Sequence, residues 1–436
     1  MVDSSLLRVL SLNCWGLLLV SKQREKRLKA IADYLSKGDY DLVALQEVWV
    51  QDDYECIREK TVNTLPFAKY FYSGTLGSGL VLLSKHPFVS TSYWRYTLAG
   101  RPLKIFHGDF YVGKGCASAC IDHPALGLLQ LFTTHLHAGY GVADEYRGHR
   151  ISETWELTSM IRDAMSQGRQ VIVTGDFNSI PTSYNYQVLR DHGFMTDSWA
   201  EVHASLTNGI ASDQQQDIND DQLQFIQRHG ITCNSSINSW SKHYGALQPK
   251  GSRLDYVFYK KTAQLECIDS YVDLVDPIPG TSLSHSDHFG VCSTFRICAA
   301  TSPKLSPLHP CQTNLTMATV QEITLILQTD HHTMQRMSRR LLVTFLLLLL
   351  LVLLFYITMV VVPIHVYNPV HQSVILWLLP LVVGPFLIAA SALSIVCLIV
   401  GFVFGYAEAQ HTHQFVTDLQ TLLTGLQLKS DSNSAL

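Results

Sequence analysis

Residues 341–407 form a stretch of 67 residues that contains no Asp, Glu, Lys or Arg. Soluble domains carry about 25% charged residues, so a small aqueous domain does not leave that much chain uncharged. The whole chain has 436 residues, of which 16% are charged. Because the deficit lies in one region, the sequence predicts a membrane segment joined to a large water-soluble part.

Two membrane spans fit within the uncharged stretch. Residues 341–362 are 22 predominantly apolar residues. At ~1.5 Å per residue they give about 33 Å of helix, enough to cross a hydrocarbon core of about 30 Å. The alternative is a buried core helix. A second span is predicted at residues 376–402, and the connector between the two lacks Lys and Arg. The pair predicts a C-terminal transmembrane helical hairpin.

Three arginines, Arg336, Arg339 and Arg340, precede the first span. Positive residues stay on the cytosolic side, so we expect both termini, the water-soluble part and the tail at residues 408–436 to be cytosolic. The N-terminus lacks a basic region followed by an uninterrupted apolar run, so no signal peptide is expected. Ten cysteines without C-x-x-C pairs indicate reduced thiols in that compartment.

The water-soluble part is expected to be an α+β fold, a two-layer sandwich with one core. Amphipathic helices are predicted at residues 24–35 and 146–165. Residues 299–335 are predicted to be a linker and juxtamembrane segment. Short apolar or β-branched runs bounded by Gly, Asp, Asn or Ser predict strands. The predicted strands are residues 6–12, 42–45, 80–83, 126–136, 170–173, 254–259 and 289–296.

Polar patches adjoin several of these predicted strands. Five follow a strand and the sixth starts one. They are Leu12-Asn13-Cys14-Trp15, Leu45-Gln46-Glu47, Thr134-His135-Leu136-His137, Gly175-Asp176-Phe177-Asn178, Ser286-Asp287-His288 and Arg253-Leu254-Asp255-Tyr256. Each patch alone has a structural explanation, such as a turn cap, an Asx-turn or a surface ion pair.

Taken together, the patches indicate metal-assisted attack of water on a phosphodiester. Glu47, Asp176, Asn178 and Asp287 supply oxygen ligands of the kind that Mg²⁺ takes. His288 supplies a base whose pKa lies near physiological pH. We expect Asp255 to hold the His288 ring in one tautomer and His135 to assist the leaving group.

The ordered set N-x-W, Q-E, T-H-x-H, G-D-x-N, R-x-D-Y and S-D-H resembles the endonuclease/exonuclease/phosphatase superfamily. Within it, residues 6–297 resemble the magnesium-dependent neutral sphingomyelinases. The closer cues include Gln46-Glu47-Val48-Trp49, Ser84-Lys85-His86-Pro87, Phe106-His107-Gly108-Asp109 and the C-terminal apolar hairpin. The resemblance implies a two-sheet α/β sandwich, with residues 1–298 as the catalytic domain.

The resemblance also implies a role for each matching residue. Glu47 is the expected principal Mg²⁺ ligand, with Asn13 beside it and Mn²⁺ as a substitute ion. Asp176 and Asn178 are expected to hold the scissile phosphate and the attacking water. His288 is the expected general base and His135 the expected acid. Asp255 and Asp287 are expected to orient His288, and Asp287 is also expected to contribute to the metal site. His137 is the alternative to His135.

Residues 108–115 (GDFYVGKG) nearly match a nucleotide-binding loop, but Gly115 replaces the hydroxyl residue that would meet Mg²⁺. ATP binding is therefore not expected. Lys114 is a candidate contact for phosphate or an anionic lipid, and a solvated loop lysine is the alternative. Asp109 is expected to help shape the substrate site.

With these residues, the resemblance implies a membrane-anchored phosphodiesterase of the phospholipase C type that cuts sphingomyelin to ceramide and phosphocholine. The partners are then a membrane sphingolipid and the bilayer, with an anionic lipid as activator; an endoplasmic reticulum or Golgi location follows from the resemblance. Oligomeric state stays open. The same motifs also serve inositol-phosphoceramide and lysophospholipids such as lyso-platelet-activating factor, so these head groups are alternatives.

Two other classes compete with a lipid hydrolase. A nuclease is disfavoured because residues 1–335 hold 28 basic and 33 acidic side chains, whereas a duplex binder needs a basic surface. No nucleic-acid partner is expected. An inactive membrane scaffold is disfavoured because Glu47 and His288 are both present.

Overall fold

The computed structural model describes residues 5–98, 100–139, 144–204, 222–241, 251–299, 312–365 and 369–434. The chain divides into two compact units. The first contains residues 1–100 and 106–319, and the second contains residues 101–105 and 320–436. Each unit is described by itself.

The first unit contains two six-stranded sheets, with orders β11-β12-β1-β2-β4-β3 and β5-β6-β7-β8-β10-β9. This is the two-sheet α+β sandwich that the sequence predicts. In the first sheet the strands are β1 (Leu6–Asn13), β2 (Leu42–Gln46), β3 (Phe67–Tyr70), β4 (Val81–Ser84), β11 (Leu265–Asp273) and β12 (Gly290–Ile297). In the second they are β5 (Phe88–Arg95), β6 (Gly115–His123), β7 (Gly127–His135), β8 (Gln170–Asp176), β9 (Thr196–Asp197) and β10 (Asp255–Tyr259).

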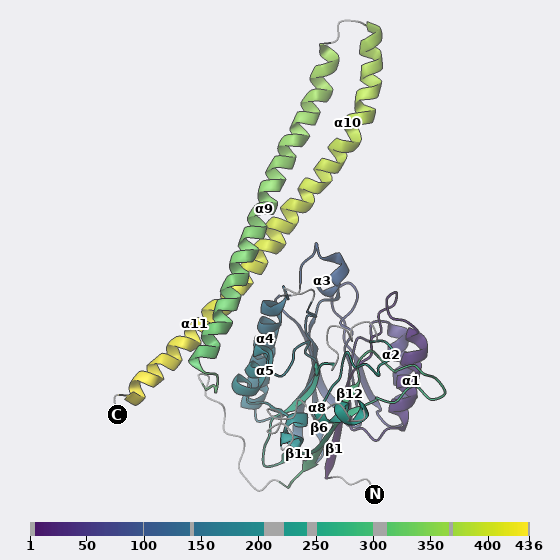
Figure 1. Ribbon diagram of the computed structural model, residues 1–436, viewed down its shortest axis with the longest axis vertical. Helices are drawn as coiled ribbons and strands as arrows, with labels where there is room; N and C mark the ends of the chain where they lie inside the picture. The colour runs from purple at the N-terminus through teal and green to yellow at the C-terminus, as the bar shows by residue number, and fades with distance from the viewer. Residues whose placement is uncertain are drawn as a thin grey trace. The chain divides into compact units, whose positions relative to one another are not determined.

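Helices cover the outer face of each sheet, and Figure 1 shows α1 and α2 on one side of the sandwich with α4 and α5 on the other. The helices of this unit are α1 (Arg24–Lys37), α2 (Gln51–Thr61), α3 (Asp109–Val112), α4 (Arg147–Ser166), α5 (Tyr184–Gln187), α6 (Ser198–Val202) and α8 (Gln222–His229). The predicted helices at 24–35 and 146–165 correspond to α1 and α4.

Three apolar clusters follow from this layering. The central cluster joins residues of the two sheets, such as Leu7 and Leu131. A second joins α1 and α2 to the first sheet through Leu28, and a third joins α4 to the second sheet through Leu157. All four of these leucines are buried. Burial of such side chains drives folding, and the polar strand ends are left to form a rim.

Strand direction brings the polar patches to one rim of the sandwich. β1 and β2 run parallel, with Asn13 beside Gln46, so both end at the same edge. β7 and β8 run parallel, with His135 beside Asp176. β10 runs antiparallel to β8 and begins with Asp255 opposite Asp176. β12 runs antiparallel to β1, so His288 precedes it at the same rim.

Two glycines permit close backbone approaches at this rim. A Cβ on Gly16 would lie 2.3 Å from the carbonyl oxygen of Glu47, to which the Gly16 amide donates. A Cβ on Gly175, which has φ +145°, would lie 2.1 Å from the carbonyl oxygen of Thr134. Neither position accommodates a larger residue without moving the backbone.

The second unit is built from long helices: α9 (Met317–Ile364), α10 (Pro369–Leu398), the π-helical segment η3 (Ile399–Gly405) and α11 (Tyr406–Ser434). The helical stretches at Met317–Ile364 and Val370–Asp431 are long and apolar enough to cross a membrane. The two stretches run past one another and are joined by a hydrogen bond, in which Ser338 Oγ donates to the carbonyl oxygen of Gly401 at 2.7 Å. The predicted spans at 341–362 and 376–402 lie on these helices.

Candidate active site

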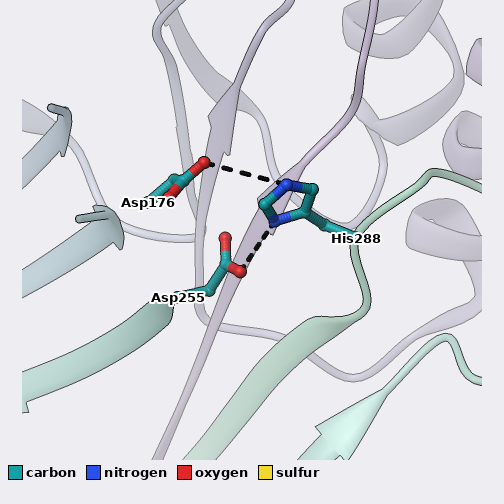
Figure 2. Close-up of side chains that lie close together, drawn as sticks. All are labelled: Asp176, Asp255 and His288. Atoms are coloured by element: carbon teal, nitrogen blue, oxygen red, sulfur yellow. Dashed lines mark hydrogen bonds and ion pairs between the residues drawn. The ribbon is translucent and has the colours of Figure 1, made fainter. Parts of the chain in front are cut away.

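His288 is the centre of a cluster of buried side chains at the rim (Figure 2). Its Nδ1 lies 2.8 Å from Oδ2 of Asp255, and its Nε2 lies 3.9 Å from Oδ2 of Asp176. The Asp255 carboxylate can therefore accept a hydrogen bond from Nδ1–H, which directs Nε2 toward Asp176. This is the arrangement in which a carboxylate orients a histidine base.

Asn13 joins this cluster to Glu47. Its Nδ2 donates to Oε1 of Glu47 and to Oδ2 of Asp176, both at 3.0 Å. Its Oδ1 accepts the backbone amide of Trp15 at 3.0 Å. Asn13 thus holds two carboxylates from different sheets next to one another.

The backbone at three rim residues is in the left-handed region. Trp15 has φ 48°, Glu47 has φ 58° and Asn178 has φ 45°. Non-glycine residues in this region cost free energy and persist where the surrounding structure holds them. Such positions concentrate at functional sites, and here each adjoins a predicted ligand.

Asn178 and Asp287 complete the set at the rim. The Asn178 amide donates to Oδ1 of Asp176 at 2.9 Å, and its Nδ2 donates to the carbonyl oxygen of Leu136 at 3.0 Å. Ser286 Oγ donates to the carbonyl oxygen of Asn13 at 2.6 Å and places Asp287 next to the first sheet. Asn178, Asp287 and Glu47 are partly exposed, so ligands can reach them.

Burial and neighbouring charges shift the pKa values of the site residues. Burial raises the pKa of Asp176, and the Asp255 carboxylate adds to that rise. Burial also raises the pKa of Asp287, with Glu47 adding to it. For His288, burial opposes the charged ring, but Cys233, Asp255 and Asp176 outweigh it, so its pKa lies well above the ordinary value.

The donor set fits a divalent cation. Asp176, Asp255 and His288 offer ligand atoms within 4.8 Å of one another. Oδ1 of Asp255 is buried and has no hydrogen-bond partner among the residues that the structure describes. Glu47 and Asp287 lie at the same rim, so a cation there would meet several carboxylates.

The two histidines of the T-H-x-H patch lie in different surroundings. Nε2 of His135 lies 3.5 Å from Oδ2 of Asp176, at the rim. His137 is fully buried and its Nδ1 contacts Oε1 of Glu153 on α4. A strand continuing through both residues would place them on one face, but β7 ends at His135, so strand alternation does not reach His137.

Lys114 and Asp109 form a buried ion pair with Nζ 3.1 Å from Oδ1. Lys114 also donates to the carbonyl oxygen of Leu136 at 2.7 Å, the same oxygen that accepts from Asn178. Burial lowers the pKa of His135 well below its usual value, and Lys114 adds to that effect. Lys114 and Asp109 thus adjoin the site, and the ammonium group of Lys114 is directed at oxygens of the protein.

Arg27 is a member of the site region that no motif indicated. Its side chain is fully buried, and it donates to the carbonyl oxygens of Cys14 at 2.9 Å, Trp15 at 2.6 Å and His285 at 3.1 Å. Its guanidinium lies 4.6 Å from the ring centroid of Trp15. The one available signal was its position on the stripe of α1 that is otherwise apolar.

This fold and this rim are those of the endonuclease/exonuclease/phosphatase family. The model of the Endonuclease/Exonuclease/phosphatase family matches residues 10–288, and the chain belongs to that family. It is a hydrolase of phosphodiester bonds.

Curated relatives narrow the comparison further. The chain is 36% identical over 339 residues to the inositol phosphosphingolipids phospholipase C of Schizosaccharomyces pombe, covering 77% of each chain. It is 30% identical to the protein of the same name from Saccharomyces cerevisiae, over 96% of this chain and 92% of the relative. It is 31% identical to sphingomyelin phosphodiesterase 2 of Homo sapiens, over 66% and 64% of the two chains.

Proposed function

We propose that this chain is a membrane-anchored, Mg²⁺-dependent phospholipase C that hydrolyses phosphosphingolipids to ceramide and a phosphorylated head group. The observation that carries the proposal is the His288–Asp255 pair facing Asp176. That pair lies in a chain that aligns over 96% of its length with a phospholipase C acting on inositol phosphosphingolipids.

The proposed reaction is attack of water on phosphorus. Nε2 of His288 takes a proton from water while the water oxygen bonds to phosphorus. Asp255 keeps the other ring nitrogen protonated and stabilises the charged ring. The bond from phosphorus to the ceramide oxygen breaks, and that oxygen takes up a proton from solvent.

Asn178 and His135 are proposed to orient the phosphate. Asn178 is partly exposed beside Asp176, where its side chain is within reach of a phosphoryl oxygen. His135 was expected to act as an acid, but burial lowers the pKa of its ring, which favours the neutral form. A neutral ring donates a hydrogen bond more readily than a proton, so we propose that it holds the phosphate in line.

Glu47, with Asn13 and Asp287, would hold Mg²⁺ because these residues offer oxygen ligands and two of them are partly exposed. Bound there, the ion would offset the negative charge that grows on the phosphoryl oxygens. Mn²⁺ is proposed as a substitute. His288 is left to move the proton of the attacking water.

The head group is proposed to be inositol phosphate first and phosphocholine second. The support for the inositol lipid is the longer coverage of the two yeast relatives, together with the 36% identity of the Schizosaccharomyces pombe protein. Sphingomyelin, which the sequence placed first, is supported by the human relative over a shorter alignment.

The membrane arrangement is proposed from the apolar helices and the arginines before them. Residues 1–298 would form the catalytic domain and residues 299–335 the linker. Residues 341–362 and 376–402 would span the bilayer, with the tail at 408–436 and both termini cytosolic. A tether near the substrate raises its effective concentration. An endoplasmic reticulum or Golgi membrane is proposed.

The test is release of water-soluble head group from labelled inositol-phosphoceramide, sphingomyelin and lyso-platelet-activating factor in mixed micelles. The full chain is assayed with Mg²⁺ and with EDTA, next to Glu47→Ala and to Glu59→Ala, an exposed glutamate of α2. We expect Mg²⁺-dependent release from inositol-phosphoceramide that Glu47→Ala loses and Glu59→Ala retains. Turnover of sphingomyelin alone would reverse the head-group preference, and no turnover of any lipid would refute the function.

A further inference from the structure

Four loops around the mouth of the site contain no charged residue. They are residues 14–21 after β1, 71–80 between β3 and β4, 177–189 after β8, which include the short helix α5, and 230–241, whose Cys233 pairs with His288 in an isolated β-bridge. They comprise 43 residues, of which about seven would be charged at the 16% content of the whole chain. These four segments thus contribute no charge to that end of the sandwich.

Apolar side chains of these loops point to solvent. The apolar rim is defined by Leu18, Leu19, Val20, Tyr72, Leu76, Ile180 and Ile237, all of them exposed. Leu19 is 95% exposed, in a run of three consecutive exposed apolar residues. A concentration of exposed apolar groups on a folded domain marks an interaction surface.

The most exposed part of the apolar rim is attached to the catalytic residues. The turn at residues 17–21 is closed by the Ser21 amide, which donates to the carbonyl oxygen of Leu17 at 3.1 Å. The preceding Gly16 amide donates to the carbonyl oxygen of Glu47 at 2.9 Å. The position of Leu18, Leu19 and Val20 is thereby fixed relative to the predicted metal ligand.

Tryptophans line the inner side of this surface. Trp15 and Trp240 lie with ring centroids 5.5 Å apart, and Trp240 Nε1 donates to the carbonyl oxygen of Ser284 at 2.8 Å. Both rings are partly exposed. Trp is enriched where a protein meets the lipid head groups, because its ring is apolar and its N–H is polar.

We propose that the apolar rim seats the mouth of the site on the lipid bilayer, with Leu18, Leu19 and Val20 entering the interface. The occupant is lipid, because a protein on this surface would cover the mouth through which substrate must pass. The loops also offer no charges for pairing with a protein partner. This proposal rests on the proposed function, since it assumes a substrate that lies in the bilayer.

Insertion can be measured without catalysis. The full chain carrying Leu19→Trp is placed in phosphatidylcholine nanodiscs with brominated acyl chains, and the added tryptophan emission is compared with that in unbrominated discs. The matched variant is Leu128→Trp, because Leu128 is 45% exposed and lies in the β6–β7 hairpin at the opposite end of β7 from His135. Quenching specific to Leu19→Trp is expected, and equal quenching in both variants would overturn the proposal.

Catalysis supplies the second measurement. In the triple variant Leu18→Ser, Leu19→Ser, Val20→Ser we expect turnover of long-chain substrate in bilayers to fall about tenfold, since interfacial binding scales with buried apolar area. Turnover of a short-chain, monomeric analogue should stay within about twofold, because the variant removes no group that touches the phosphate. Leu128→Ser should change neither rate.

The outcomes separate this proposal from the proposed function. An equal loss on both substrates would show that the triple variant disturbs the site itself and would refute bilayer docking. If the unmodified chain cleaves no sphingolipid, the proposed function fails, and the quenching comparison still decides whether the apolar rim enters the bilayer.

Discussion

His288 and Asp255 are joined by a contact of 2.8 Å between Nδ1 and Oδ2, although 32 residues separate them in the chain. β10 begins at Asp255 and β12 begins two residues after His288, in different sheets. The pair therefore exists only when the two sheets are packed together. Its second ring nitrogen faces Asp176, so the same packing aims the base at the predicted phosphate site.

Replacing His288 by Ala should lower kcat by about 10²–10⁴-fold, the usual contribution of a general base. The fold should persist, because the ring lies at the rim rather than in an apolar cluster. Head-group release and the melting temperature in detergent check both points. His86→Ala, which alters a histidine just after β4 at the far end of the sandwich, should leave kcat unchanged. Activity retained in His288→Ala would remove its role as base.

Substitutions of the two histidines in the T-H-x-H patch should have different effects on kcat and on the melting temperature. His135→Ala should lower kcat with little change in melting temperature, because His135 adjoins Asp176 at the rim. His137→Ala should lower the melting temperature, because it removes the ring that contacts the buried Glu153 carboxylate. Parallel kinetics and thermal unfolding check this, and the reverse pattern would exchange the two roles.

The sequence predicted the strands that carry the site, because each is a short apolar run that ends in a polar patch. It missed β5, whose residues alternate poorly because most of its side chains are exposed. It also missed β6, whose buried face is built from small residues such as Ala117 and Ala119. Small and half-exposed strands give weak hydrophobic patterns, so periodicity does not find them.

The sequence predicted which residues form the candidate site, but it did not predict the contacts between them. Family resemblance named Asn13, Glu47 and Asp176, yet it gave no sign that one amide joins the two carboxylates. Arg27 was missed because its partners are backbone oxygens, which any sequence supplies. Contacts of this kind depend on tertiary packing, and no local pattern encodes them.

Arg27 should stabilise the loops that carry the site. Arg27→Gln would leave several buried carbonyl oxygens without a donor, so we expect a loss of at least about 2 kcal/mol in the free energy of unfolding. kcat should also fall, because the Cys14 and His285 segments adjoin Asn13 and Asp287. Chemical unfolding in detergent and the head-group assay measure the two effects. Arg58→Gln, at a more exposed position on α2, is the control.

His192 should make stability depend on pH in acid. Burial lowers its pKa to about 4, with Arg162 adding to the effect, and its ring stacks on Trp155 at 4.5 Å. The unfolded chain has an ordinary pKa of about 6.5 at this residue. Between these values the unfolded state binds more protons, so stability is lost as the pH falls from about 6.5 to about 4.

His192→Phe keeps a ring for the stack on Trp155 and removes the titration. The melting temperature of the variant should therefore fall less than that of the unmodified chain between pH 6.5 and pH 4.5. Comparing the two pH-induced changes cancels any constant effect of the substitution on packing. Equal changes in the two proteins would mean that His192 does not titrate on unfolding.

Mg²⁺ should bind more tightly as the pH rises. Burial raises the pKa of Asp176 and of Asp287, and the pKa of His288 is raised as well, so the metal-free rim retains protons that a bound cation must displace. The Mg²⁺ concentration that gives half-maximal activity should then decrease from pH 6 to pH 8. Calorimetry in two buffers of different ionisation enthalpy should detect proton release on Mg²⁺ binding.

Glu47→Gln tests whether this coupling belongs to the metal site. The substitution keeps the shape of the side chain and one acceptor for Nδ2 of Asn13, but it removes the charge that would bind the ion. The Mg²⁺ concentration that gives half-maximal activity should rise at least about tenfold at every pH, because a hard cation binds chiefly through charged oxygen ligands. Proton release on Mg²⁺ binding should persist in this variant, since the ion still has to displace protons from Asp176 and Asp287. An unchanged Mg²⁺ requirement in Glu47→Gln would move the ion away from Glu47, toward the Asp176, Asp255 and His288 cluster.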